Sequence, residues 1–401
     1  MQAIGIVCEY NPFHAGHFYQ IEESRRLVGA DCAVVCAMSG DFVQRGEAAV
    51  FSKFARAEAA CRSGADLVVE LPLPWCLSSA EGFAAGAVSI LASLGCTHLS
   101  FGSEGGDLEA LQKLASFSAD PETLAMIRNY MEQDASLSFA RARQLAAEKE
   151  FGADAELLSQ PNNILAVEYL KAVHCGGFDM IPLAIPRIGS GHDDAGEGGF
   201  RSAMQLRELL AKGEDVSEFL PPEAMAVFQR ELDAGRVRNE RVLEAALLSR
   251  LYPLRPEDFD RLPDAENGVG RRLHHALWQG KGIEETVRIA VNKRCTAARM
   301  RRMLLCAALG VCADDTKAAP PYVRVLAANE KGMRLLRGAA GSGAIPLLGK
   351  AADARRLGKQ ADRVFTLTAQ AHALYCLQFD AIDDRDPNSD WRQGILFVNN
   401  A

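Results

Sequence analysis

The sequence lacks several features that mark specialised classes of protein. Nowhere in its 401 residues do eighteen apolar residues occur together, and its start, MQAIGIVCEYNPFH, has no basic leader before an apolar stretch. We therefore expect no membrane span and no secretory signal, and a cytoplasmic location. The eleven cysteines are scattered, odd in number and never spaced C-x-x-C, which argues against a disulfide framework and a zinc ribbon.

The chain also lacks an excess of positive charge. It has 44 Lys and Arg against 52 Asp and Glu, for a net charge of -8. Any contact with nucleic acid must then come from a local basic patch. With 48% hydrophobic residues over this length, the composition is typical of a globular chain of two domains. We expect the domains to cover residues 1–215 and 216–401.

The first hundred residues alternate short apolar runs with longer helical patterns, which predicts an α/β fold with a doubly wound parallel sheet. Strands are predicted at 3–7, 32–38, 66–71, 98–101 and 179–187, the last near an edge because of its prolines. Residues 107–175 have helical spacing, and a capped helix is expected from Ser202 to about Lys212. Beyond Pro221 the pattern is mainly helical, with helices at about 222–234, 238–251, 268–278, 283–290 and 296–309. A small mixed tail, 321–401, contains β-type runs at 322–326, 345–348 and 395–398.

The first predicted turn from strand to helix carries the string His14-Ala15-Gly16-His17. In a doubly wound sheet, ligands bind outside the carboxyl ends of the strands, where this turn lies. A helix N-terminus favours phosphate, Gly16 lets a nucleotide approach the backbone, and two imidazoles can donate to a leaving pyrophosphate. We predict that His14 and His17 are catalytic. The alternative is that they only cap and pack the helix.

H-x-G-H on the first βα turn is the ATP-binding motif of the nucleotidylyltransferase superfamily, which also has a late serine and arginine motif opening another helix. The string Arg201-Ser202-Ala203-Met204-Gln205-Leu206-Arg207 resembles that element in weakened form. Ser202 would cap the helix, and Arg207, the third predicted catalytic residue, would reach the phosphates. A capped surface helix is the alternative for this segment.

A closer resemblance extends over nearly the whole chain. The strings GIVCEYNPFHAGHFYQI, AMSGDFVQRGEAAVFSKFAR, GADLVVELP, FGSE, QPNNILAVEYLKA and IPRIGSGHDD resemble, in order, the bacterial tRNA(Met) cytidine acetate ligase family. NKRCTAARMRRMLLCAALG and PYVRVLAANEKGMRLL continue the match. The resemblance implies an enzyme that uses ATP and acetate to make N4-acetylcytidine at the wobble position of elongator tRNA(Met).

The resemblance also implies an ATP site, with Mg²⁺ carried on the nucleotide and no metal held by the protein alone. Its residues are Val7, Cys8, Glu9, Tyr10, Asn11, Pro12, Phe13, His14, Ala15, Gly16, His17, Phe18, Tyr19, Gln20, Gly102, Asn162, Arg187, Ile188 and Ser202. Asn162 could read a purine edge or merely cap a helix, and Arg187 could clamp phosphate or form a surface ion pair. His192 departs from the family pattern, so no role is assigned to it.

Two further groups of polar residues remain open at this stage. Gln44 and Arg45 follow the second strand and could face acetate, the phosphates or the tRNA. Lys53 and Arg56 carry the same ambiguity, with a solvated helix face as the favoured alternative.

The segment 288–302, RIAVNKRCTAARMRR, has six basic residues and no acidic one. This asymmetry is typical of an element that binds nucleic-acid phosphates. We predict tRNA contacts by Lys293, Arg294, Arg299, Arg301 and Arg302, with Arg299 and Arg302 on one helix face and Met300, Met303 and Leu304 pointing inward. The alternative is a helix neutralised by neighbouring acids such as Glu284 and Glu285.

Three other functions stay open. One is a small-molecule nucleotidylyltransferase or adenylate-forming ligase of the same superfamily, which would not require the long helical region. A class I aminoacyl-tRNA synthetase shares H-x-G-H, but no K-M-S-K-S string follows here. The third is a non-catalytic RNA-binding protein that keeps a residual nucleotide pocket.

Overall fold

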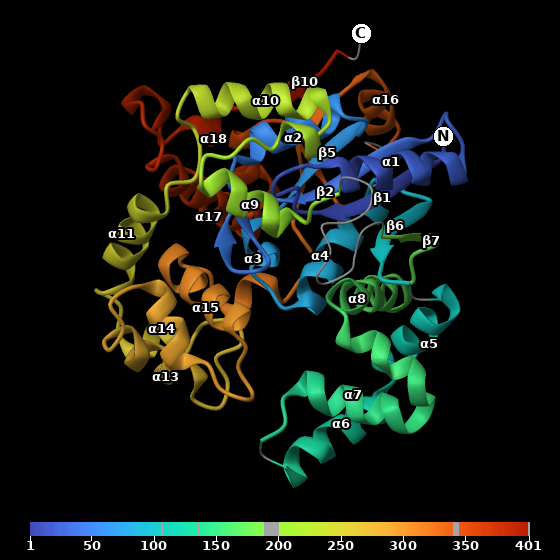
Figure 1. The fold of residues 1–401 in the computed structure, drawn as a ribbon, viewed down its shortest axis with the longest axis vertical. Coiled ribbons are helices and arrows are strands. Elements are labelled where there is room, and N and C mark those ends of the chain that lie inside the picture. The colour runs from blue at the N-terminus through green and yellow to red at the C-terminus, as the bar shows by residue number, and fades with distance from the viewer. Residues whose placement is uncertain (106, 135, 188–199, 340–344, 400–401) are drawn as a thin grey trace.

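The computed structural model describes residues 1–105, 107–134, 136–187, 200–339 and 345–399. Its centre is an eight-stranded sheet with helices on both faces (Figure 1). The strand order is β10-β8-β5-β2-β1-β6-β7, and β9 pairs with β8. The strands are β1 (Ala3–Cys8), β2 (Ala33–Ser39), β5 (Leu67–Leu71), β6 (His98–Ser103), β7 (Ile181–Pro186), β8 (Val323–Ala328), β9 (Leu347–Leu348) and β10 (Leu396–Phe397). A separate hairpin pairs β3 (Phe42–Val43) with β4 (Glu47–Ala48).

The five strands from β5 to β7 are mutually parallel, which confirms the predicted doubly wound sheet. Strand β2 shows why its sequence, AVVCAMS, is almost continuously apolar. Val35 and Ala37 pack into one core, and Val34, Cys36 and Met38 pack into another on the opposite face. A parallel strand covered on both faces needs apolar residues at every position. The proline-containing β7 lies at the edge of the sheet, as predicted.

The helices of the first half cover both faces. Helix α4 contacts β1, β2 and β5, and α2 packs on β5 and β8. Their bounds are α1 (Ala15–Val28), α2 (Lys53–Arg62), α3 (Leu73–Cys76), α4 (Ala80–Ser93), α5 (Leu108–Ala119), α6 (Pro121–Gln133), α7 (Phe139–Phe151), α8 (Pro161–Gly176) and α9 (Ala203–Ala211), with a 3₁₀ segment η1 (Gly152–Ser159). The predicted helical stretch 107–175 is thus confirmed as four helices with short breaks.

The helices predicted beyond Pro221 are also confirmed. They are α10 (Pro222–Asp233), α11 (Glu240–Leu251), α13 (Val269–Leu277), α14 (Ile283–Ala290) and α15 (Ala297–Leu309). Shorter elements are α12 (Pro256–Phe259), η2 (Ser217–Phe219) and η3 (Ala313–Thr316). Helices α11 to α15 share a core with α17 and the β3–β4 hairpin. No helix in the described ranges is long and apolar enough to cross a membrane.

The tail, whose order the sequence left open, completes the sheet of the first half. Strand β8 pairs antiparallel with β5, and β9 and β10 both pair with β8. The other tail elements are α16 (Glu330–Ala339), α17 (Lys359–Cys376), α18 (Ser389–Arg392), η4 (Ala351–Leu357) and η5 (Ile382–Asp384). The expected region 216–401 therefore holds two different parts: the helices α10 to α15, and a tail from about residue 321 that adds three strands to the sheet of residues 1–215.

Candidate nucleotide and substrate site

The carboxyl ends of β1, β6 and β7 bring most of the predicted site residues together. Strand β1 leads into the histidine turn, which we define as residues 11–17, and β6 and β7 end beside it at Ser103 and Pro186. Ligands of doubly wound sheets bind at this edge, where the strand order reverses. Ile188 and His192, two residues named from the sequence, lie outside the described residues.

The histidine turn is built as a helix cap. Nδ1 of His14 accepts a hydrogen bond from the Gly16 N–H at 3.0 Å, and Nδ1 of His17 accepts one from the His14 N–H at 3.3 Å. The two rings are stacked, with centroids 3.8 Å apart. Since each Nδ1 is an acceptor, the proton of each neutral ring lies on Nε2. The capping interpretation is correct as far as it goes, and it also leaves each ring with one free donor.

Both rings are held neutral. Burial, and then the charge of Arg187, lower the pKa of His14 to about 3. Burial, His14 and Arg187 also lower the pKa of His17 well below its usual range. The pair can thus donate Nε2–H hydrogen bonds to phosphate oxygens without carrying positive charge at neutral pH.

Other residues of the 7–20 segment anchor the histidine turn through buried side chains and a hydrogen bond. Tyr10 and Phe13 are fully buried, and Asn11 Oδ1 accepts the Val50 N–H at 2.8 Å. Tyr10 has a φ of 48°, a left-handed conformation that is uncommon for a bulky residue. Such strain persists where the surroundings over-determine the backbone, as happens at functional sites.

On the other side of the turn, three predicted residues lie together. Arg187 Nη1 donates to Asn162 Oδ1 at 3.2 Å, and a side chain on Gly102 would meet the Arg187 Cγ at 3.4 Å. The cap interpretation of Asn162 is wrong, because its amide bonds Arg187 and Glu104 instead of the start of α8. Arg187 is exposed, and the pKa effects above show that its charge acts on the histidine pair.

Helix α9 brings the third predicted catalytic residue to the same turn. Ser202 is its N-cap, as predicted, and it also forms a reciprocal capping box with Gln205. Arg207 donates to the Asn11 carbonyl at 3.0 Å and pairs with Glu47 at 3.2 Å. A helix distant in sequence thus places a guanidinium next to the histidine turn.

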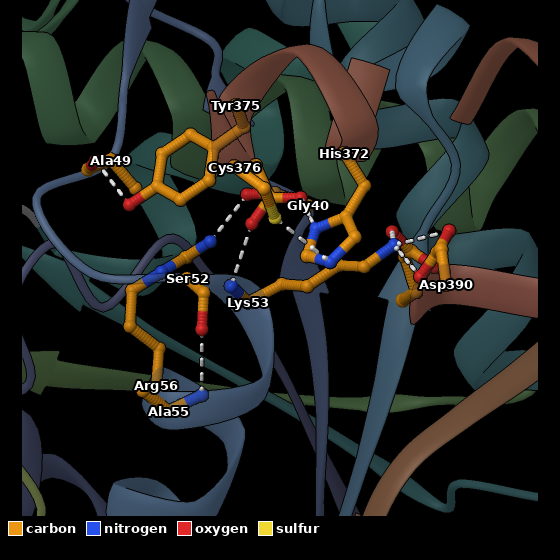
Figure 2. Close-up of polar contacts among 12 residues, drawn as sticks. Gly40, Ala49, Ser52, Lys53, Ala55, Arg56, His372, Tyr375, Cys376 and Asp390 are labelled. Carbon is orange, nitrogen blue, oxygen red and sulfur yellow. Dashed lines mark hydrogen bonds and ion pairs between the residues drawn. The ribbon is translucent and has the colours of Figure 1, made fainter. Parts of the chain in front are cut away.

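The prediction of a solvated helix face for Lys53 and Arg56 is wrong, because both side chains are fully buried (Figure 2). Lys53 Nζ lies 2.7 Å from Glu70 Oε1 and 2.8 Å from Asp390 Oδ1. Arg56 donates to the carbonyls of Phe51, Ser39 and Gly40, and to that of Glu9 at the end of β1. Neither side chain faces solvent or substrate, because the polar groups of each are bonded within the protein around the loop that follows β2.

A second buried group lies beside Lys53. Asp41 accepts a hydrogen bond from His372 Nδ1 at 2.7 Å, and His372 Nε2 lies 3.5 Å from Cys376 Sγ (Figure 2). Burial opposes the charge on His372, but Asp41 raises its pKa to about 10. The arrangement has the residue types of a nucleophilic triad, but all three side chains are buried. We therefore assign it a structural role.

The basic segment 288–302 is largely paired within the protein. Arg301 bonds Glu284 at 2.8 Å, and Arg299 donates to the Asp264 carbonyl at 2.6 Å. Arg302 is buried and donates to the Gln44 carbonyl, whereas Met300, Met303 and Leu304 point inward as predicted. The prediction that Arg302 grips RNA is wrong in this structure, because its guanidinium is enclosed between α15 and the loop after β2. Lys293 stays exposed and Arg294 half-buried.

Two site residues were missed. Glu104 bonds both the side chain and the backbone N–H of Asn162, and Glu47 pairs with Arg207. The position of Glu104, one residue beyond β6, was a signal that could have found it. Glu47 gave no such signal, since its partner is 160 residues away. Among the described residues, no three His, Cys, Asp or Glu side chains gather in a metal site.

Comparison with known proteins agrees with this geometry. The model of the HIGH Nucleotidyl Transferase family matches residues 1–390. A relative from Syntrophotalea carbinolica, named tRNA(Met) cytidine acetate ligase, is 38% identical over 357 residues, 87% of this chain and 84% of the relative. Crystal structures of TmcAL from Thermotoga maritima, one apo and one bound with alpha-thio ATP, superpose with TM-scores of 0.91 and 0.90. They are 30% and 29% identical and cover 99% of this chain and 100% of their own. The chain belongs to the tRNA(Met) cytidine acetate ligase family, a branch of the HIGH nucleotidyl transferases.

Proposed function

We propose that this ligase activates acetate with ATP as acetyl-adenylate and transfers the acetyl group to N4 of the wobble cytidine of elongator tRNA(Met). The observation that carries the proposal is the neutral, stacked histidine pair at the carboxyl edge of the sheet, flanked by Arg187 and Arg207. The alpha-thio ATP bound by the TmcAL of Thermotoga maritima supports ATP as a substrate of this chain.

In the first step, a carboxylate oxygen of acetate attacks the α-phosphorus of ATP. The bond from that phosphorus to the bridging oxygen breaks, and pyrophosphate leaves. His14 and His17 donate from Nε2 to the phosphate oxygens, and Arg207 shares the charge of the leaving group. We propose these three as the catalytic residues and place the nucleotide along 7–20, Gly102, Asn162, Arg187, Ile188 and Ser202. The enzyme contributes mainly position and fixed donors, as in other phosphoryl transfers.

In the second step, the exocyclic amine of cytosine attacks the acetyl carbonyl carbon. The carbon–oxygen bond to AMP breaks, and the amine loses one proton as AMP departs. This amine is conjugated with the ring and weakly nucleophilic, so a mixed anhydride is needed. The base must leave its stack to reach the pocket, which suits a single-stranded anticodon loop.

We propose that Mg²⁺ arrives with the triphosphate, and that the reaction takes place in the cytoplasm with the tRNA pool. For the RNA, we propose contacts at the turn 291–296 through Lys293 and Arg294. Across from this turn, hydrogen bonds from Ser136, and then the charges of Arg294 and Lys293, lower the pKa of Asp134 after α6.

The test is incubation with labelled acetate, ATP, Mg²⁺ and total tRNA, followed by nucleoside analysis. Labelled N4-acetylcytidine in elongator tRNA(Met) is the expected product. Acetate-dependent ATP–pyrophosphate exchange without label in RNA would favour a small-molecule ligase, and no exchange would favour a non-catalytic RNA-binding protein. For the RNA face, Lys293→Glu with Arg294→Glu should weaken tRNA binding by about tenfold or more and reduce its salt slope, with exchange unchanged.

A further inference from the structure

The loop between β2 and α2, residues 40–52, is held in place by contacts with α17 and α15. Asp41 binds His372, and the hydroxyl of Tyr375 donates to the carbonyls of Ala49 and Val50 (Figure 2). Gly46, with a φ of 82°, packs directly on α15, where a side chain would meet the Arg302 backbone at 2.7 Å. The loop is therefore a rigid platform beside the histidine turn.

One charged side chain of this platform, that of Arg45, has no ion-pair partner among the described residues. The nearby arginines 207, 238, 301 and 302 each lie within 4.0 Å of a carboxylate oxygen. Arg45 has no ion pair and no side-chain hydrogen bond within the described part of the chain, and it is exposed. An unpaired guanidinium on a rigid platform is prepared for an anion from outside.

The position of Arg45 indicates which anion. The Gln44 N–H donates to Glu9 Oε1 at 2.9 Å, which places the next residue, Arg45, at the end of β1. The charge of Arg45 acts on both Glu9, directly after β1, and Arg207, which donates to the Asn11 carbonyl of the histidine turn. In the sheet, β2 lies on the opposite side of β1 from β6 and β7, which carry Gly102 and Arg187. A nucleotide over β1, β6 and β7 would leave the β2 side free for the attacking carboxylate.

We infer that Arg45 binds the carboxylate of the acid substrate and holds it for attack on the α-phosphorus. The inference rests on the proposed function, and it assigns the acetate contact within that reaction. Glu9 accepts the Gln44 N–H beside Arg45; burial raises its pKa, whereas that hydrogen bond and the charges of Arg45 and Arg207 oppose the rise.

The experiment is acetate-dependent ATP–pyrophosphate exchange by the full chain without tRNA, with Arg45→Gln and Arg45→Lys. Removing a charged hydrogen bond should raise the KM for acetate by roughly 10- to 100-fold, with the KM for ATP within about twofold. Arg45→Lys keeps the positive charge but loses the paired N–H donors of the guanidinium. Its KM for acetate should therefore lie between those of the wild type and Arg45→Gln. Arg62→Gln, which removes an exposed arginine at the far end of α2, is the matched control and should leave both constants unchanged.

Each outcome decides the inference. An unchanged KM for acetate in Arg45→Gln overturns it. If the KM for acetate is unchanged and a separate assay of tRNA acetylation shows a higher KM for tRNA, Arg45 binds the RNA backbone instead. Since Arg45 is exposed and makes no ion pair or side-chain hydrogen bond with the described residues, both variants should keep the thermal midpoint of the wild type. If the wild-type chain itself shows no acetate-dependent exchange, the proposed function is wrong. This result differs from the one that overturns the role of Arg45, in which the wild type is active and the variant has an unchanged KM for acetate.

Discussion

Two buried histidines at the same edge of the sheet are driven in opposite directions. His14, in the histidine turn, is stacked on His17, and burial and then the charge of Arg187 lower its pKa to about 3. His372, in the ion network under the loop 40–52, faces Asp41, and its pKa rises to about 10. The first ring is a neutral donor open to a ligand, and the second is a cation closed into the protein. The partner, and not the residue type, decides whether a histidine serves binding or architecture.

The largest expected effect comes from disrupting the buried ion network that lies under the loop 40–52. Lys53→Met leaves Glu70 and Asp390 with Arg324 as their remaining buried cation. Removing one member of a buried ion cluster should lower the free energy of unfolding by about 3–5 kcal/mol. Urea denaturation measures this change. The control Lys113→Met removes an exposed pair with Glu109 and should cost under about 1 kcal/mol. Equal losses for the two variants would contradict a structural role for Lys53.

The next largest effect comes from changing the histidine turn. His17→Ala should reduce acetate-dependent pyrophosphate exchange by about 10²- to 10³-fold, the usual scale for a lost donor to developing charge. Circular dichroism should show little change in the fold, because His17 is only partly buried. The matched control is His174→Ala, which removes an exposed histidine near the end of α8. A wild-type exchange rate in His17→Ala would remove the histidine turn from the chemistry.

Two neighbouring arginines on α15 show the same contrast between a buried and a partly exposed side chain. Arg302→Met removes a buried guanidinium between the helix and the Gln44 carbonyl, and it should lower the unfolding free energy by about 1–3 kcal/mol. Arg301→Met removes a partly exposed pair with Glu284 and should cost under about 1 kcal/mol. Thermal melts of both variants check this order. The reverse order would show that the pairing on α15 is misassigned.

The smallest effect is a slope with pH. Because the folded pKa of His372 lies above its ordinary value of about 6.5, its stabilising contribution is complete below that pH and is lost as pH rises toward 10. His14 acts in the opposite sense, since its folded pKa is lowered and stability is lost as pH falls below about 6.5. One titrating proton changes the unfolding free energy by at most about 1.4 kcal/mol per pH unit. Denaturation of His372→Gln between pH 6.5 and 10 should give a flatter alkaline limb than the wild type, and an unchanged limb would contradict the Asp41 ion pair.

Local patterns in the sequence predicted most of the fold. Apolar runs, helical spacing and glycine stops marked the parallel strands and helices of the first half and the helices after Pro221, because these signals act within a few residues. The histidine turn and the Ser202 cap were found for the same reason, since each is a short motif at a helix start. The sequence could not place the tail, because the pairing of β8 with β5 joins segments more than 250 residues apart.

By itself, the sequence determined where most of the strands and helices before the tail lie, that a helix starts at the His14–His17 string, and that Met300, Met303 and Leu304 face inward. Only the tertiary structure decided which charges remain available. Lys53, Arg56 and Arg302 look like surface cations in the sequence, and all three are enclosed by acceptors from distant segments. Arg45 is the opposite case, a cation left unpaired on a rigid loop. A charge is satisfied by whatever lies within hydrogen-bond distance in space, and the pattern along the chain does not record that distance.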